Sequence, residues 1–180
     1  MSLKVNQIGS RNQLVTLAEA KAWLRVTLSN EDTLIQTLIN ASVLWAEGYC
    51  KRVFAGGSFE LYSDSYDFTI PNAPVSSVSL SYLSSGSYVV INGSNYKVDT
   101  TEIEPCIVFN DTYEVPDYDT SIEAIKVAYT GGYSDTTVPD NVKQAILCKV
   151  ASMYDNRTEE NQRWVTTAEM LLMPYRIFNI

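Results

Sequence analysis

The sequence predicts an α+β fold in which helical segments at both ends flank a β-rich middle. Apolar residues recur at helical spacing near the two ends of the 180-residue chain, whereas apolar and polar residues alternate between them. With 46% hydrophobic and 19% charged residues, the composition is that of a globular protein. We expect one structural unit with a helical part at 14–56, a β insertion at 58–132, a second helical part at 138–174, and terminal arms at 1–13 and 175–180.

The first helical part is predicted to contain two helices. Thr16 and Glu19 have the spacing of a capping box, which indicates a helix over 17–28. Ser29 and Asp32 repeat that spacing and indicate the start of a longer helix.

The long helix carries an apolar stripe wide enough to face a core on one side and a neighbouring molecule on the other. Trp45 and Tyr49 lie on one side of this stripe. The Gly56-Gly57 pair is expected to end the helix, because glycine readily adopts the conformation that terminates helices.

Alternation indicates several strands in the middle of the chain. The clearest runs over 78–82, with apolar residues on one face and serines on the other. Ser85-Gly86 is predicted to be a turn, and Asn92-Gly93 is the strongest hairpin signal, because both of its residues tolerate positive φ. Gly131-Gly132 is expected to close this β region.

Two further helices are predicted near the C-terminus. Pro139 and Asp140 mark the start of the first. Thr166 or Thr167 can cap a short second helix, which Pro174 ends. The tail after Pro174 is apolar and aromatic, which suggests that it docks onto something.

Catalytic and cofactor motifs are missing from the sequence. It contains no histidine, the commonest general base and metal ligand, and neither a Walker loop nor a GxGxxG motif. Asp111, Asp117 and Asp119 could hold calcium, but an acidic loop explains them more simply. A catalytic carboxylate pair could come from these three or from four other acidic residues of the β half, although loop carboxylates are usually solvated; the four are Asp64, Asp67, Glu102 and Glu104. We therefore expect no enzyme activity, no cofactor and no metal.

The net charge of −8 argues against a protein that grips nucleic acid, since phosphate contacts need a basic surface. An acidic wall could nevertheless line a path through which DNA slides. The three cysteines are widely separated and no signal peptide or 18-residue apolar run occurs, which favours a reducing cytoplasm and no membrane contact.

Candidate interface residues lie on the long helix and in the last 30 residues. Tyr154, Asn156 and Arg157 could form an ordinary helix end, or could hold two helical halves or two subunits together. Trp164, Tyr175 and Phe178 could anchor an interface or pack on their own subunit. The full set is Trp45, Tyr49, Arg52, Tyr154, Asn156, Arg157, Trp164, Tyr175, Arg176 and Phe178.

Several segments in order resemble the head–tail connector (adaptor) proteins of long-tailed bacteriophages. They are LAEAKAWLRV at 17–26, EDTLI at 31–35, PNAPVSSV at 71–78, YKVD at 96–99, VAYTGGY at 127–133, VKQAIL at 142–147 and YDNR at 154–157. The chain looks like the longer version of that family, which carries a β insertion between its helices.

The resemblance implies a structural virion protein that is not an enzyme. Such proteins form a dodecameric ring beneath the portal and bridge the DNA-filled head to the tail after packaging. The implied partners are other copies, the portal protein, a downstream neck or tail-completion protein, and DNA that passes without specific binding. We expect the chain at the head–tail junction of the virion, and in the host cytoplasm during assembly.

Other roles remain open. One is a tail-completion or neck protein one layer lower. A second, from a different class, is a ligand- or glycan-binding β module, which would need a concave aromatic face. In the leading interpretation, residues 1–13 and 164–180 are disordered in the free monomer and ordered in the assembly.

Overall fold

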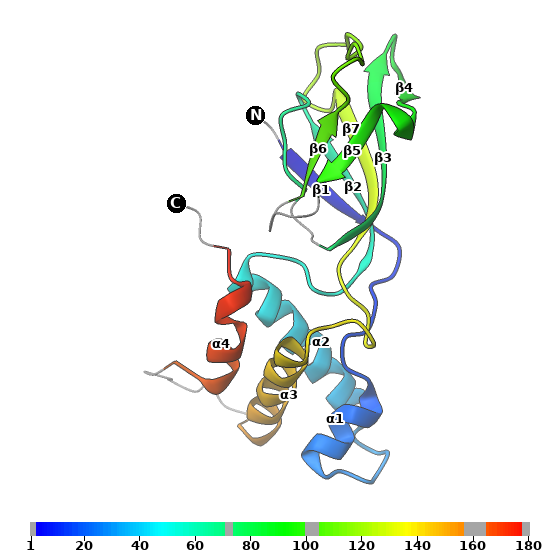
Figure 1. The fold of residues 1–180 in the computed structure, drawn as a ribbon. Helices are drawn as coiled ribbons and strands as arrows, with labels where there is room; N and C mark the ends of the chain where they lie inside the picture. Colours follow the sequence, from blue (N-terminus) through cyan, green and yellow to red (C-terminus); the bar gives the residue numbers. More distant parts are fainter. Residues whose placement is uncertain (1–2, 71–73, 100–104, 157–164, 178–180) are drawn as a thin grey trace. The chain divides into compact units, whose positions relative to one another are not determined.

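The computed structural model describes residues 3–70, 74–99, 105–156 and 165–177 and confirms the α+β class (Figure 1). The chain divides into two compact units. Residues 1–11 and 56–132 form the β unit, and residues 12–55 and 133–180 form the helical unit.

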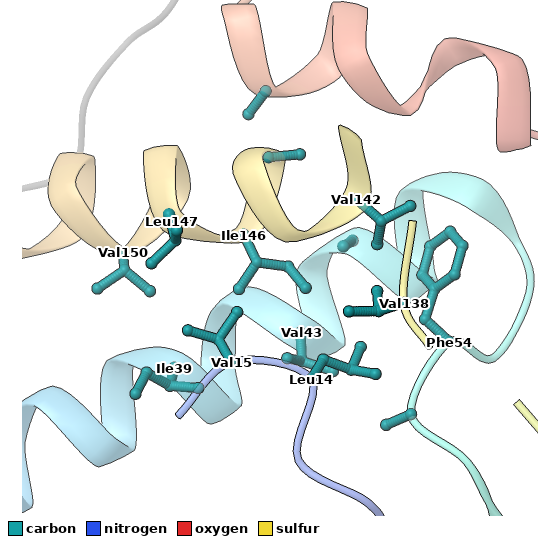
Figure 2. Close-up of a cluster of buried hydrophobic side chains, with 14 of the residues drawn as sticks. Leu14, Val15, Ile39, Val43, Phe54, Val138, Val142, Ile146, Leu147 and Val150 are labelled. Atoms are coloured by element: carbon teal, nitrogen blue, oxygen red, sulfur yellow. The ribbon is translucent and has the colours of Figure 1, made fainter. Parts of the chain in front are cut away.

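Within its described residues, the helical unit contains four helices around one apolar cluster. They are α1 (Leu17–Leu24), α2 (Asp32–Cys50), α3 (Asp140–Asp155) and α4 (Thr167–Leu172), followed by the 3₁₀ turn η2 (Met173–Tyr175). Figure 2 shows Ile39 and Val43 of α2 and Val142 and Ile146 of α3 among the side chains of this cluster. The apolar stripes predicted for the two long helices therefore meet in one core.

Two predicted helix starts are confirmed by their caps. The Thr16 hydroxyl accepts a hydrogen bond from the Glu19 amide at 3.2 Å, while the Glu19 carboxylate accepts one from the Thr16 amide at 2.7 Å. Thr166 and Glu169 form the same reciprocal box at α4. A capping box involves residues three apart, so its geometry can be inferred from local sequence.

The predicted start and end of the long helix are wrong. Glu31, not Ser29, is the N-cap of α2, and it makes no side-chain capping bond. The helix stops at Cys50, because Lys51 takes a left-handed conformation with φ of 56° well before the glycine pair. Arg25, with φ of 59°, likewise ends α1 four residues earlier than predicted.

In the part of the β unit that the structure describes, five strands form an antiparallel sheet in the order β1-β2-β7-β3-β4. Its strands are β1 (Leu3–Ile8), β2 (Gly57–Ser63), β3 (Val75–Ser84), β4 (Ser87–Val90) and β7 (Ile125–Gly131). A second, two-stranded sheet pairs β5 (Tyr96–Asp99) with β6 (Cys106–Phe109), and the short turn η1 (Gly93–Asn95) precedes β5.

The prediction of an unstructured arm over 1–13 is wrong for most of that segment. Residues 3–8 form β1 and pair in register with β2, from Leu3 opposite Ser63 to Ile8 opposite Ser58. All six residues of β1 are exposed, so the strand buries no apolar face that would have produced a clear periodic pattern. The sheet is therefore completed by a strand that precedes the first helix.

The hairpin predicted at Asn92-Gly93 is also wrong. Asn92 instead caps η1, with its side chain accepting the Ser94 amide at 3.0 Å. The tight hairpin lies at Ser85-Gly86, where φ values of 51° and 78° connect β3 to β4. Two successive residues with positive φ give the twist that joins antiparallel strands, and here serine supplies one of them.

Candidate interaction surface

Seven of the ten candidate interface residues fall within the described structure, and all seven lie in the helical unit. Arg157, Trp164 and Phe178 lie outside the described residues. The seven divide into the aromatic side of α2, the turn and tail at its C-terminal end, and the end of α3.

The aromatic side of α2 is covered by cations of its own chain. The rings of Trp45 and Tyr49 stack with centroids 5.9 Å apart. The ammonium of Lys149 lies 4.9 Å from the Trp45 ring centroid, and the guanidinium of Arg176 lies 5.0 Å from that of Tyr49. Such cation–π contacts hold α3 and the C-terminal tail against α2, so this side of the helix has partners within the subunit.

The C-terminal tail docks on the end of α2. The Ile177 amide donates a hydrogen bond to the Cys50 carbonyl at 3.0 Å, and the Tyr175 ring meets Phe54 edge-on at 6.1 Å. Ala168 and Leu172 of α4 are buried in the core. Residues 167–175 thus form α4 and η2, while the expected disorder of residues 164–180 in the free monomer stays a prediction.

The turn after α2 is organised by a buried carboxylate. Glu47 is 9% exposed, and its Oε1 accepts hydrogen bonds from the amides of Phe54 and Ala55 at 2.9 and 3.0 Å. The Arg52 guanidinium lies 5.6 Å from the Phe54 ring centroid. Arg52 therefore contributes to packing of this turn within the subunit.

The end of α3 contacts the start of α2. The Tyr154 hydroxyl donates to a Glu31 carboxylate oxygen at 2.5 Å, which joins the two helical parts of the chain. Asn156 is the C-cap of α3 and donates its amide to the Ser152 carbonyl. Asn156 therefore ends a helix, and Tyr154 links the two helical halves of one subunit.

An ion pair connects α1 to α3. The Lys143 ammonium lies 2.7 Å from Glu19, which also completes the α1 capping box. The Lys143 hydrogen bond, followed by that of the Thr16 amide, lowers the pKa of Glu19 from 4.5 to about 2. The sequence revealed the cap but not the ion pair, because Lys143 is 124 positions away.

Sequence reasoning missed the outer face of α2, opposite its buried stripe. Leu34, Leu44 and Gly48 are exposed there, with 59% of Leu44 accessible. The sequence does contain an indication of this surface, because none of the exposed positions of α2 carries a charged residue. The predicted interface residues Trp45 and Tyr49 lie instead on the side of α2 that contacts Lys149 and Arg176 of the same chain.

Charge is unequally divided between the two units. The β unit has four basic and eleven acidic residues, a net charge of −7, whereas the helical unit has nine and ten, a net charge of −1. Seven of the eight net negative charges therefore belong to the β unit, although the acidic residues themselves are divided almost equally.

The acidic loop has a local structural role. Asp119 accepts a hydrogen bond from the Gly86 amide at 3.0 Å and thereby supports the β3–β4 hairpin. Within the described residues, no group of three or more histidine, cysteine or acidic side chains is placed to hold a metal ion. No helix in that part of the chain is long and apolar enough to cross a membrane.

Comparison with a protein family agrees with the resemblance predicted from the sequence. Residues 14–92 match the family described as phage gp6-like head-tail connector protein. The match spans α1, α2 and the first part of the β unit, and covers somewhat less than half of the chain. No curated protein matches the chain.

Solved structures share the fold along nearly the whole chain. A chain in the neck of an empty gene transfer agent (GTA) particle, computed with C6 symmetry, aligns with a TM-score of 0.81 and 17% identity, covering 98% of this chain and 97% of that one. A chain of the native GTA virion gives 0.81 and 18%, covering 98% and 96%. A chain in the native GTA neck, computed with C12 symmetry, gives 0.75 and 17%, covering 98% and 97%.

Proposed function

We propose, from the premise that this chain is a structural head–tail connector protein, that its copies form a closed ring in the neck of a phage-like particle. The observation that carries the proposal is the match of residues 14–92 to the connector family. The likeness of fold extends over 98% of the chain and includes both units. A neck computed with C12 symmetry supports twelve copies per ring.

The position that we propose is beneath the portal, between the DNA-filled head and the tail. The partners would be other copies, the portal protein and a downstream neck or tail-completion protein. Catalysis has no part in this role, which is to connect and to keep the DNA path open. The acidic β unit suits that path, because a surface with a net charge of −7 repels phosphate rather than retaining it.

A tail-completion protein one layer lower would share much of this architecture. Co-sedimentation with purified portal and, separately, with purified tail-tube protein distinguishes the two positions. We expect binding to the portal. Binding to the tail tube alone would move the chain to the lower layer.

The glycan-binding alternative has less support. Tyr62 and Tyr88 lie near each other on the five-stranded sheet, with centroids 6.3 Å apart, but their planes are tilted by 58°. Their hydroxyls are already bonded to Glu60 and to the Glu123 carbonyl. Sugar stacking favours flat exposed rings whose polar surroundings are free to bind hydroxyl groups, and this pair does not offer that arrangement.

The test of the proposed function is the location and copy number of the chain in particles. Native mass spectrometry of the purified protein, with and without portal, should show a closed oligomer in at least the portal-containing sample. Labelled chain should be found at the head–tail junction of purified particles. A protein that stays monomeric with portal and is missing from particles would overturn the proposal.

A further inference from the structure

The outer face of α2 is uncharged along its whole length. Its exposed residues are Thr33, Leu34, Thr37, Asn40, Leu44 and Gly48. A helix that faces solvent normally carries charged residues on its outer side. The chain has 34 such residues, since it contains 13 basic and 21 acidic ones, and α2 places none of them on this face. Leu34 and Leu44 are 43% and 59% exposed instead.

Gly48 gives a second reason to regard this face as a contact surface. It lies inside α2, and a Cβ at that position would meet nothing within 4 Å. The subunit therefore has no steric need for glycine there, although glycine is unfavourable in a helix relative to alanine. A missing side chain lets another backbone come close, which is a need that only a partner outside the subunit would create.

The partner must offer a different face, because a ring closes through heterologous contacts between two unlike surfaces. The outer face of α4 and η2 meets this requirement. Its exposed residues are Val165, Thr167, Met170, Met173 and Pro174, all of them uncharged. Met170 and Met173 are 60% and 52% exposed. Glu169, the acidic residue of α4, instead bonds the Thr166 amide in the capping box.

The chemistry of the two faces is complementary. Methionine side chains are flexible and fill irregular gaps, so they suit a helix surface that has a prominent leucine beside a glycine. The helical unit carries a net charge of only −1, so two copies can approach through it with little repulsion. The aromatic side of α2 contacts Lys149 and Arg176 of the same chain and is partly buried, whereas Leu44 and Gly48 on the outer face are exposed.

We propose that the outer face of α2 in one copy packs against the outer face of α4 in the next copy. This contact rests on the proposed ring and identifies the surfaces that would build it. It differs from the aromatic set suggested by the sequence, whose described members are engaged within the subunit.

The test is cross-linking in purified particles that carry variants of the full chain. Cys106→Ser and Cys148→Ser remove the two partly exposed thiols. Cys50 can stay, because burial raises its pKa to about 11 and keeps it in the unreactive thiol form. Leu44→Cys and Met170→Cys are then introduced together, and the particles are treated with a bismaleimide.

We expect a ladder of covalent oligomers from the double variant and monomers from each single variant. The control pair Leu44→Cys with Gln144→Cys, which places the second thiol on an exposed position of α3, should give no ladder. Dimers from Leu44→Cys alone would indicate an α2–α2 contact and overturn the proposal. So would monomers from the double variant in particles that contain the chain.

The outcome for the ring itself is separate. If the unaltered chain is absent from particles, the proposed function fails and this contact fails with it. If the chain is incorporated and does not cross-link, only the contact is wrong. As a second measurement, Leu44→Glu should reduce incorporation about tenfold or more, since a charge would be buried at the contact, whereas Gln144→Glu should leave incorporation unchanged.

Discussion

The helical unit and the β unit differ in net charge and in the kind of surface that they expose. The helical unit is nearly neutral, and its exposed surface includes uncharged leucines and methionines. The β unit carries a net charge of −7, and the loop after β6 is rich in acidic residues. Neutral apolar surfaces suit permanent contact between copies, whereas an acidic surface suits contact that must not persist. Under the proposed function, we therefore expect the helices to carry the assembly contacts and the β unit to face the DNA path.

The largest expected effect comes from the helical core. Ile146→Ala removes a fully buried side chain from the cluster shared by α2 and α3 and should lower the free energy of unfolding by about 3 kcal/mol. None of the three tryptophans falls in the residue ranges of the β unit, and Trp23 and Trp45 lie on α1 and α2, so tryptophan emission in a urea titration reports on the helical unit.

Leu80→Ala is the matched change in the β unit, where Leu80 is equally buried. It should appear in the far-ultraviolet circular dichroism of the sheet and shift the tryptophan transition much less. An equal shift of the tryptophan midpoint by both variants would show that the two units unfold as one.

A smaller but still large effect is expected at the turn after α2. Glu47→Ala leaves the buried Phe54 and Ala55 amides without their acceptor, which should cost about 2 kcal/mol. Glu47→Gln keeps an acceptor oxygen and should cost less. The two variants are compared by thermal unfolding, and an alanine variant as stable as the glutamine variant would contradict this role.

Gly48→Ala should separate the stability of the subunit from that of the assembly. The free chain should gain about 0.5–1 kcal/mol, because alanine is the better helix former and its methyl group meets open space. Incorporation into particles should fall, because the added methyl group would obstruct the contact. A variant that is both more stable and fully incorporated would argue against close packing at this position.

The smallest effect is expected at the Glu19–Lys143 pair. The pKa of Glu19 is lowered from 4.5 to about 2, so its ionised form stabilises the fold above pH 4.5 and this contribution disappears as the pH falls toward 2. Glu19 is 39% exposed, so solvent screening limits the effect to about 0.5 kcal/mol.

Glu19→Gln should therefore be slightly less stable than the parent at pH 7 and should approach the parent below pH 3. Urea titrations at the two pH values measure the difference. Lys143→Met, which removes the cation but leaves the capping box, should behave similarly. A difference that grows on acidification would contradict the ion-pair explanation.

Much of the helical unit could be predicted from the sequence because the signals are local. The boxes at Thr16 and Thr166 connect residues three apart, and the buried stripes of α2 and α3 repeat every three to four residues. The strand faces of β2, β3 and β7 were also evident from alternation. In each case the residues that form the pattern lie within one helix or strand.

What the sequence could not supply was pairing between distant segments. β1 has no buried face, so only its register with β2 identifies it as a strand. The predicted turn at Ser85-Gly86 is confirmed, but the Asn92-Gly93 dipeptide makes no hairpin, because β4 pairs with β3 and β5 pairs with β6 in the second sheet. Turn propensity is a weak preference, and strand pairing with burial outweighs it.

The same division applies to the candidate surface. The sequence by itself determined that two helical parts flank a β-rich middle, the stripes of the core and the resemblance to connector proteins. Only the tertiary structure decided that Trp45, Tyr49 and Tyr175 are engaged within the subunit and that Leu44 and Gly48 remain open. The physical reason is that a helix face is exposed or covered according to what folds against it, and the segments that cover α2 come from the other end of the chain.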